Sequence, residues 1–316
     1  MRQSFPPAGN QRRSRGAILA LLLWAVLGGC LATRRTADPT DAVNSRGLHN
    51  VIRVSDRLIS GSLPENDRGF DELDSLGVKT IISVDGATPD VARAAARGMR
   101  YVHVPVGYHG LSVAQQRRIA RAARDLPGPI YLHCHHGKHR GPAAAASAAV
   151  LLGEMSPEAG DAFLKKAGTS SSYPGLFACV QSARALDAKE LDATPPDFPA
   201  IAPRPAFVEA MSAAQDAFDH LVAIRDAQWR TPASHPDLVP TAEAARLESL
   251  LRGMLDDPAA TGRPADFLPM LRASQQRAAE LEVEIAAGAA ADVLTAGLAR
   301  LGATCRDCHT IYRDQR

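Results

Sequence analysis

The sequence HCHHGKHRGP, residues 133–142, joins two predicted elements of different kinds. Residues 129–133, PIYLH, are a short apolar run with β-branched and aromatic side chains, which predicts a buried strand. The alanine-rich residues after Pro142 predict a helix, with the proline in its first turn, where a missing N–H costs little. The stretch is therefore a loop between the carboxyl end of a strand and the amino end of a helix, which is where α/β sheets bind ligands.

The residue types in this loop favour the binding of a phosphate group. Consecutive backbone N–H groups at the amino end of a helix can bind an anion. Cys134 would feel this positive field together with Lys138, Arg140 and the neighbouring histidines, so we expect the pKa of its thiol to fall. A thiolate that faces a bound phosphate is a nucleophile for covalent catalysis, and an arginine can donate to two phosphate oxygens. The predicted phosphate-binding residues are His135, His136, Gly137, Lys138, His139 and Arg140.

Residues 49–188 alternate short apolar runs with helical stretches on both sides of the loop. Strands are predicted at residues 51–54, 58–59, 78–84, 100–104 and 129–133. Helices are predicted at residues 67–76, 91–97, 113–124, 142–155, 157–167 and 174–188, the third of them capped by Ser112. This alternation predicts an α/β domain with a mainly parallel central sheet.

The pattern His-Cys-x5-Arg, in its strand–loop–helix context, resembles the signature loop of the protein tyrosine and dual-specificity phosphatase superfamily. The resemblance covers residues 50–188. It implies that Cys134 forms a phosphocysteine intermediate, that Arg140 binds the phosphoryl group, and that the backbone N–H groups of residues 135–140 complete the binding site. The substrate would be a phosphorylated small molecule or protein.

Two departures from this family bear on catalysis. The family usually has Ser or Thr after the arginine, which assists hydrolysis of the intermediate, whereas this chain has Gly141. The family also uses an aspartate as general acid on a loop after an earlier strand, and the matching stretch, residues 105–110, has none. His109 can act as an acid near neutral pH, and Asp85 after the strand at 78–84 is the other candidate. A domain that binds an oxyanion without hydrolysis stays open as an alternative.

Other histidines and cysteines of this region have simpler interpretations. His103 and His133 lie on predicted strands and are expected to be buried structural residues. The histidine cluster around the loop could suggest a metal site, but an anion-binding loop already accounts for it. Cys179 lies in an apolar helix and is expected to pack as a small hydrophobic residue.

The N-terminal residues predict an export signal. Several arginines precede the apolar run at residues 17–27, which is too short to span a bilayer comfortably. Residues 27–30, LGGC, resemble a bacterial lipobox, which implies lipidation of Cys30; an ordinary signal peptide with an incidental cysteine is the alternative. We expect a signal peptide at residues 1–30 and a tether at residues 31–48. The expected location is the periplasmic side of a bacterial envelope, with the outer membrane favoured because Leu31 is not acidic.

A proline-rich stretch at residues 189–204 predicts a linker, and strand signals disappear after it. Apolar residues at helical spacing predict helices at residues 207–227, from 241 onward, 264–287 and 290–312. Residues 205–316 are therefore expected to form an antiparallel four-helix bundle, separate from the α/β domain.

The last predicted helix contains Cys305-Arg306-Asp307-Cys308-His309, which is a c-type haem attachment motif. Cysteines at i and i+3 share one helix face, so each can bond a haem vinyl carbon while the adjacent histidine faces the iron. A thioredoxin-like site would need a βαβ context, and a zinc site would need a fourth nearby ligand, neither of which the sequence offers.

A motif on the last helix of such a bundle resembles the cytochrome c-prime family, over residues 205–316. The resemblance implies covalent haem c attached at Cys305 and Cys308, with His309 as axial ligand. Low-spin relatives supply a methionine from the first helix. Met211 lies about 9 Å along that helix, level with His309 in an antiparallel pair, so it is the candidate sixth ligand; a purely packing role is the alternative.

Composition constrains the partners. The formal net charge is +2, so nothing requires a nucleic acid. The sequence predicts an exported protein that combines a cysteine-dependent phosphatase-like domain with a haem domain for electron transfer or for redox or gas sensing. The alternative is a haem protein whose phosphatase-like domain only binds an oxyanion. The membrane would be contacted through the lipid anchor, and the redox partner is not specified.

Overall fold

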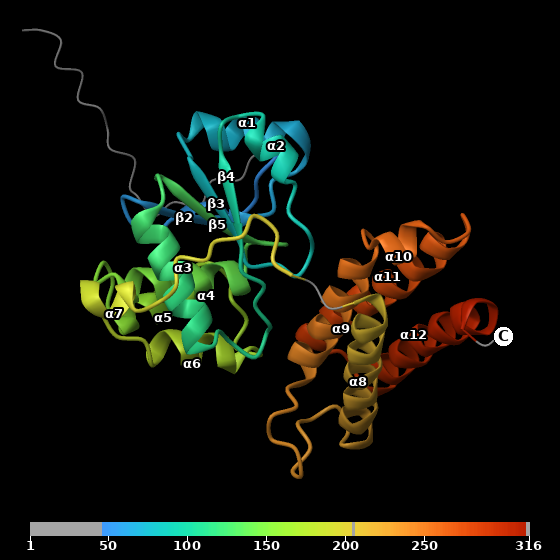
Figure 1. The fold of residues 1–316 in the computed structure, drawn as a ribbon. Helices are drawn as coiled ribbons and strands as arrows, with labels where there is room; N and C mark the ends of the chain where they lie inside the picture. The colour runs from blue at the N-terminus through green and yellow to red at the C-terminus, as the bar shows by residue number, and fades with distance from the viewer. Residues whose placement is uncertain (1–45, 204–205, 314–316) are drawn as a thin grey trace, which may run out of the picture. The chain divides into compact units, whose positions relative to one another are not determined.

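The computed structural model describes residues 46–203 and 206–313 (Figure 1). The predicted signal peptide, Cys30 and most of the expected tether lie outside the described residues. Within the described ranges, no helix is long and apolar enough to cross a membrane.

The first domain contains the predicted mainly parallel sheet. Its five strands are β1 (Ile52–Arg53), β2 (Leu58–Ser62), β3 (Thr80–Ser83), β4 (Arg100–His103) and β5 (Ile130–Cys134), in the spatial order β1-β2-β5-β3-β4. Only the edge strand β1 is antiparallel to its neighbour. The α/β fold class predicted from the sequence is therefore confirmed. Because β5 is central, Cys134 pairs with Ser62 of β2 and His133 pairs with Ser83 of β3.

Helices cover both faces of this sheet (Figure 1). Helices α1 (Asn66–Ser75) and α2 (Val91–Ala95) cover one face, and α3 (Val113–Asp125), α4 (Arg140–Leu151), α5 (Pro157–Lys166) and α6 (Pro174–Gln181) cover the other. Alternate residues of a strand point to opposite faces. Ile81 and Tyr131 accordingly belong to the core beneath α1 and α2, whereas Ile82 and Leu132 belong to the core beneath α3 to α6.

Helix α4, which follows the loop, is buried along its whole length. Its run of alanines brings the helix close to the sheet, because small side chains permit close backbone approach. Ser112 caps α3 as predicted: its hydroxyl accepts from Gln115 N, and the Gln115 side chain accepts from Ser112 N. Because strand β5 and helix α4 are both buried along their whole lengths, packing fixes both ends of the loop between them.

The predicted helix at residues 174–188 is interrupted. Helix α6 ends at Gln181, and a separate short helix, α7 (Ala188–Asp192), begins where the linker was expected. Asp187 caps α7: its carboxylate accepts from Glu190 N, and the Glu190 carboxylate accepts from Asp187 N. Asp187 has the extended backbone of an N-cap residue, so one helix cannot run through it from α6 into α7.

Residues 206–313, which we call the second domain, contain helices and no strand. Its four long helices are α8 (Phe207–Asp226), α9 (Pro240–Met254), α11 (Phe267–Ala286) and α12 (Ala291–Tyr312), with a short α10 (Pro258–Thr261). Helix α9 packs against α8 and α11, and α11 packs against α12, whereas α8 and α12 touch little. Trp229, just after α8, donates to Thr295 near the start of α12 at 3.1 Å, so these two helices are antiparallel.

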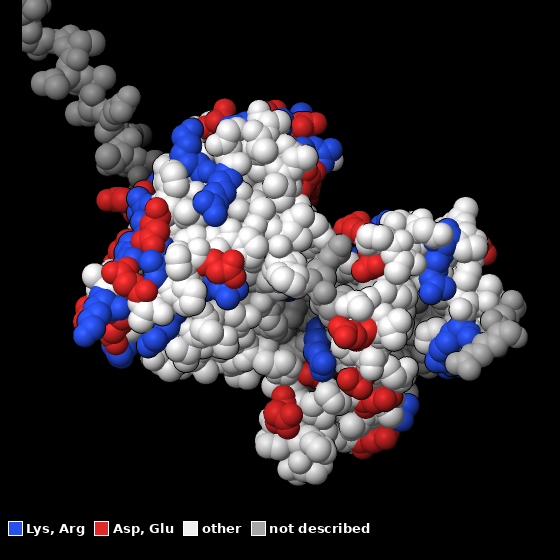
Figure 2. Space-filling model, in the orientation of Figure 1, with Lys and Arg blue, Asp and Glu red and all other residues white. Residues whose placement is uncertain are grey.

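Charged side chains of both signs are interspersed over the described part of the face in Figure 2. Many of them pair locally, as Arg97 does with Asp71 at 2.6 Å. Exposed pairs of this kind contribute little stability.

Candidate active site and candidate haem site

Cys134 lies at the end of β5 and is 3% exposed. The loop of residues 135–139 follows, and Arg140 is the first residue of α4. The structure therefore places this cysteine between the carboxyl ends of central strands and the amino end of a buried helix, which is the position inferred from the sequence.

The carbonyl groups of the loop are held by surrounding residues. His135, Gly137, Lys138 and His139 each use their carbonyl oxygen as an acceptor. The donors, in the same order, are Leu63 N, Asn50 Nδ2, Thr169 Oγ1 and Ala143 N, at 3.1, 2.9, 2.7 and 3.1 Å. A peptide carbonyl and the next N–H point in opposite directions in an extended or turn-like loop, so anchoring the carbonyls outward leaves the amides facing inward.

These amides form the cradle, by which we mean the backbone N–H groups of residues 135–140. From His136 to Arg140 they donate to no acceptor within the described residues. Gly137 makes the curl possible: its φ is +69°, and a Cβ there would lie 2.4 Å from Gly61 C. Consecutive backbone N–H groups at the amino end of a helix, with no acceptor among the described residues, are suited to binding an anion.

Arg140 is buried, at 1% exposure, and its guanidinium is held from two sides. Nη2 lies 3.2 Å from Asp85 Oδ1 and donates to Tyr108 Oη at 3.0 Å. The guanidinium carbon also lies 4.2 Å from the centre of the Tyr108 ring. Its Nε is buried and has no partner within the described residues, so one donor of the arginine remains available to a ligand.

Asp85 lies two residues after the end of β3 and is buried. Burial raises the pKa of its carboxyl group, but the Arg140 guanidinium opposes this effect, and the net pKa lies well below its usual range. The carboxylate also accepts from Gly86 N at 2.7 Å. An ionised Asp85 has no proton to donate at neutral pH, so its geometry fits the orientation of Arg140 better than the acid role considered from the sequence.

The histidines near the loop do not carry the positive charge expected of them. Burial lowers the pKa of three of them to about 4: His133, His135 and His139. They are neutral at pH 7, so the positive field at Cys134 comes from Arg140, Lys138 and the amides. Within the described ranges, no group of three His, Cys, Asp or Glu side chains is placed to hold a metal ion.

The two strand histidines are buried and hydrogen-bonded. His133 Nε2 lies 3.0 Å from Tyr101 Oη. His103 Nδ1 accepts from Ala202 N at 3.1 Å, which leaves Nε2 to donate to Asp85 O at 2.8 Å. His103 therefore helps to fix the backbone of Asp85, and through it the partner of Arg140.

His109 lies on the loop between β4 and α3, where Gly107 and Gly110 pair across a tight turn. Its side chain is 46% exposed. Among the described residues, no hydrogen bond or ion pair joins it to Cys134 or Arg140. The neighbouring Tyr108, which the sequence reasoning overlooked, contacts the arginine through its side chain, and Val106 O of the same loop accepts from Arg140 Nη1 at 3.5 Å. The sequence signal that could have identified Tyr108 is that it is the aromatic residue within residues 105–110, the stretch in which a general acid was sought.

Gly141 lies beside the nucleophile. A Cβ at this position would be 3.1 Å from Cys134 N and 3.5 Å from Cys134 Sγ. The hydroxyl that the phosphatase family usually carries here would therefore lie within reach of the sulfur, and this chain lacks it.

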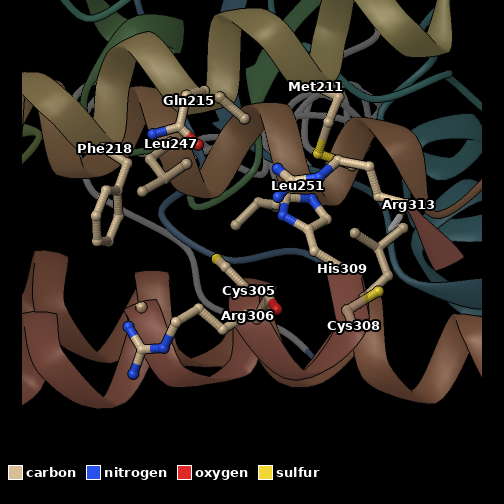
Figure 3. Close-up of a pocket in the computed structure, with 14 residues that line it drawn as sticks. Met211, Gln215, Phe218, Leu247, Leu251, Cys305, Arg306, Cys308, His309 and Arg313 are labelled. Carbon is tan, nitrogen blue, oxygen red and sulfur yellow. The ribbon is translucent and has the colours of Figure 1, made fainter. Parts of the chain in front are cut away.

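In the second domain, a cavity of about 260 Å³ is lined by residues of all four long helices (Figure 3). Cys305, Cys308 and His309 reach it from α12, and Met211 reaches it from α8. The remaining lining residues are Ala214, Gln215, Phe218, Leu247, Leu251, Leu271, Ser274, Gly302, Arg306 and Arg313. An apolar cavity with two thiols, an imidazole and a thioether is chemically suited to a covalently held haem.

An adjoining cavity of about 420 Å³ shares Met211, Cys308 and His309 with the first. The two candidate axial ligands, separated by 98 positions in the sequence, are thus brought to one place by the antiparallel pairing of α8 and α12. The cavity lies where these two helices have few contacts with each other.

Comparisons with known proteins concern the first domain. No protein-family model matches the chain. The dual specificity protein phosphatase TpbA of Pseudomonas aeruginosa (strain UCBPP-PA14) is 32% identical over 138 residues, which are 40% of this chain and 62% of TpbA. The crystal structure of P. aeruginosa TpbA aligns with 50% of this chain and 96% of its own, at 23% identity and a TM-score of 0.40. A cysteine-to-serine variant of TpbA in complex with pTyr aligns with 51% and 95%, at the same identity and TM-score.

The matched segment spans less than two thirds of TpbA. Residues from about 50 to 200 form a phosphatase-like domain that is similar in sequence to this dual-specificity phosphatase.

Proposed function

We propose that the first domain hydrolyses phosphate monoesters through Cys134 and Arg140. The observation that carries this proposal is the cradle: a run of amides without acceptors, next to a buried cysteine and a buried arginine with an unpartnered Nε. A buried donor such as Arg140 Nε costs free energy unless an acceptor satisfies it. A phosphoryl group bonded above Cys134 Sγ would supply those acceptors.

The reaction would proceed in two displacements. The Cys134 thiolate attacks phosphorus, a P–S bond forms, and the P–O bond to the alcohol breaks with its electron pair passing to the leaving oxygen. That oxygen takes a proton from His109 or from water. Water then attacks the phosphocysteine, the P–S bond breaks, and inorganic phosphate and the thiolate are released. Arg140 and the cradle hold the phosphoryl oxygens in both steps.

Asp85 acts in this scheme as a positioning residue. As an ionised carboxylate it holds Nη2 of Arg140, and its own position depends on Gly86 N and His103. Nothing in this arrangement requires Asp85 to exchange a proton during turnover.

A non-hydrolysing oxyanion-binding domain is the second candidate. Two observations favour it: Gly141 adds no hydroxyl near Cys134 Sγ, and residues 105–110 contain no aspartate. Both candidates use the same cradle, and they differ in turnover.

Hydrolysis of an aryl phosphate by the full chain distinguishes the two. The proposal expects turnover that falls by more than about 10³-fold in Cys134→Ser, while this variant still binds inorganic phosphate. Absence of turnover in the wild-type chain, with phosphate binding retained, would support the binding domain. If His109 supplies the proton, His109→Ala should remove the decline of activity at alkaline pH, and aryl phosphates with good leaving groups should be least affected.

We propose that the second domain holds a c-type haem, which Cys305 and Cys308 would attach through thioether bonds and which His309 and Met211 would ligate. The shared cavity lined by these four side chains carries this proposal. When bound, the haem would supply one-electron chemistry or the binding of a small gas. An optical spectrum of the purified holoprotein, oxidised and reduced, tests it, and a chain matured in a haem-attaching host without haem absorbance would exclude it.

We further propose that the chain is exported and anchored through a lipid on Cys30. Covalent haem attachment, by the resemblance to cytochromes c, takes place on exported chains, which agrees with the predicted signal. Radiolabelled fatty acid that is incorporated into the wild-type chain and not into Cys30→Ala would test the anchor.

A further inference from the structure

Tyr108 has the most direct contact with the arginine among the residues of the loop between β4 and α3. It is 5% exposed, and its ring packs against Tyr173 with 5.1 Å between the ring centres. Tyr173 in turn lies 4.7 Å from the ring of His139, a residue of the phosphate-binding loop. The Tyr108 ring is therefore in contact with both Tyr173 and the Arg140 guanidinium, beside the cradle.

The hydrogen bond from Arg140 to Tyr108 involves a particular edge of the guanidinium. The Nε–H and one N–H of Nη2 lie on one edge of this planar group, and this pair binds two oxygens of a phosphate. Nε has no partner within the described residues, whereas Nη2 donates to Tyr108 Oη at 3.0 Å and also faces Asp85. One of the two donors that would contact a phosphate is thus directed at the tyrosine oxygen.

The hydroxyl proton of Tyr108 is left for another acceptor. The oxygen already accepts from Arg140, and within the described ranges no hydrogen bond from Tyr108 Oη to an acceptor is present. Burial raises the pKa of this phenol, and the nearby Arg140 only partly offsets the effect, so the group keeps its proton at neutral and alkaline pH. Tyr108 and Cys134 also belong to the same cluster of buried side chains.

We propose that Tyr108 is an oxyanion-binding residue: its hydroxyl accepts from Arg140 and donates its own proton in a hydrogen bond to a phosphoryl oxygen of the substrate. This inference rests on the proposed phosphate-monoester chemistry at Cys134. Arg140 then contacts the phosphoryl group directly through Nε and indirectly through the tyrosine. A donor that is itself hydrogen-bonded to a cation is polarised and binds an anion more strongly.

Tyr108 does not replace the missing aspartate as an acid. A phenol that holds its proton this firmly is a poor proton donor to an aryl oxide. Its role is to bind the transferred group, so removal of its hydroxyl should weaken oxyanion binding even where no chemistry takes place.

Binding of inorganic phosphate to full-length chains that carry Cys134→Ser isolates this role. The comparison is between Cys134→Ser alone and Cys134→Ser with Tyr108→Phe, which keeps the ring and its stacking. Isothermal titration should give a Kd that is about tenfold or more higher in the double variant, because a charge-assisted hydrogen bond is lost. Tyr173→Phe in the same background is the matched control, since its hydroxyl is not bonded to Arg140, and it should change the Kd by less than about twofold. Thermal unfolding of each variant checks that the fold is retained.

An unchanged or lower Kd in the Tyr108→Phe chain, with phosphate binding measurable in Cys134→Ser, would overturn the role of Tyr108 and leave the proposed function intact. A Cys134→Ser chain that binds no phosphate at all would overturn the cradle, and the role of Tyr108 with it. A tenfold effect from Tyr173→Phe equal to that of Tyr108→Phe would also overturn the inference, because a hydroxyl that is not bonded to Arg140 would then matter as much as one that is.

Discussion

The two sites of this chain are built in opposite ways. The cradle is formed by backbone atoms of one short segment, residues 135–140, and its main side chains come from that segment and from the ends of neighbouring strands. The cavity proposed to hold a haem is formed by side chains from four helices, and Met211 and His309 both line it because α8 and α12 are antiparallel. The first site combines a cysteine, an arginine and anion-binding amides but lacks a hydroxyl at position 141, whereas the second groups two cysteines, a histidine and a methionine around one cavity.

The helices that carry the two sites, α4 and α12, also differ in how fully they are buried. All residues of α4 are buried, so Arg140 and the loop are fixed by a helix that packs on every side. Helix α12 buries mainly a stripe that includes Leu294, Leu298 and Leu301, and it has few contacts with α8 beside the cavity. We therefore expect substitutions near the cradle to alter chemistry within an unchanged fold, and substitutions in the cavity to alter cofactor binding first.

The largest effect is expected from replacing Cys305 and Cys308 with alanine together. Both thioether bonds would be lost, so haem should become fully extractable by acidic organic solvent, whereas the wild-type chain should retain it. Hydrolysis of an aryl phosphate should be unaffected if the two sites are independent. Haem that resists extraction in the double variant would contradict the attachment site.

Replacement of Met211 should have a smaller effect that is confined to the spectrum. If its thioether is the sixth ligand, Met211→Ala should convert a low-spin haem towards high spin, because the iron loses a strong axial donor. Met211→Leu, which fills similar volume without a donor sulfur, serves as the control for packing and should give the same change. A low-spin spectrum that both variants retain would assign Met211 to packing.

Gly141 offers a gain of activity. Gly141→Ser would place a hydroxyl near Cys134 Sγ, where it can stabilise the departing thiolate as phosphocysteine breaks down. We expect breakdown to accelerate about tenfold, measured as turnover after the initial burst. Gly141→Ala adds only the Cβ and should give no acceleration. Equal rates in the two variants would show that the hydroxyl has no part in the second step.

A further expected effect is a pH dependence of stability in the first domain. Burial lowers the pKa of His133, His135 and His139 to about 4 in the folded state, against about 6.5 in an unfolded chain. Between these values the unfolded chain binds more protons, so the free energy of unfolding should fall as the pH is lowered from 6.5 to 4. Hydrogen exchange of β5 amides, corrected for intrinsic rates, measures this for the domain alone. Protection that rises on acidification over this range would contradict the assignment of neutral buried histidines.

Much of the fold could be predicted from local sequence, because its signals are local. The β-branched run at residues 78–84, the cap at Ser112 and the helix stop at Gly288 each act within a few residues, and the structure has β3, α3 and the end of α11 in those places. The break between α6 and α7 was missed because the apolar periodicity suggested continuity, while the capping role of Asp187 depends on a competing local hydrogen bond.

For the site around Cys134, the sequence predicted the position of the main residues but not the residues that they contact. The positions of Cys134 and Arg140 follow from the motif, but the pairing of Arg140 with Asp85 depends on strand order, since β3 and β5 are neighbours in space and not in sequence. Anchoring of the loop carbonyls by Asn50 and Thr169 is non-local in the same way. The charge of the histidines could not be predicted either, because their pKa values depend on burial that only the packed fold determines.

The central claim is that one chain carries a phosphocysteine-forming cradle and a covalent haem. Mass spectrometry of the full-length holoprotein, mixed with an aryl phosphate, quenched in acid and digested, tests both parts in one measurement. The account predicts a peptide that contains Cys134 with the mass of one added phosphoryl group, absent in Cys134→Ser, and a peptide that contains Cys305 and Cys308 with the mass of one haem. Two results would contradict it. One is a chain that turns over substrate but gives an unmodified Cys134 peptide at every quench time. The other is a chain that absorbs as a cytochrome but gives a haem-free peptide at Cys305 and Cys308.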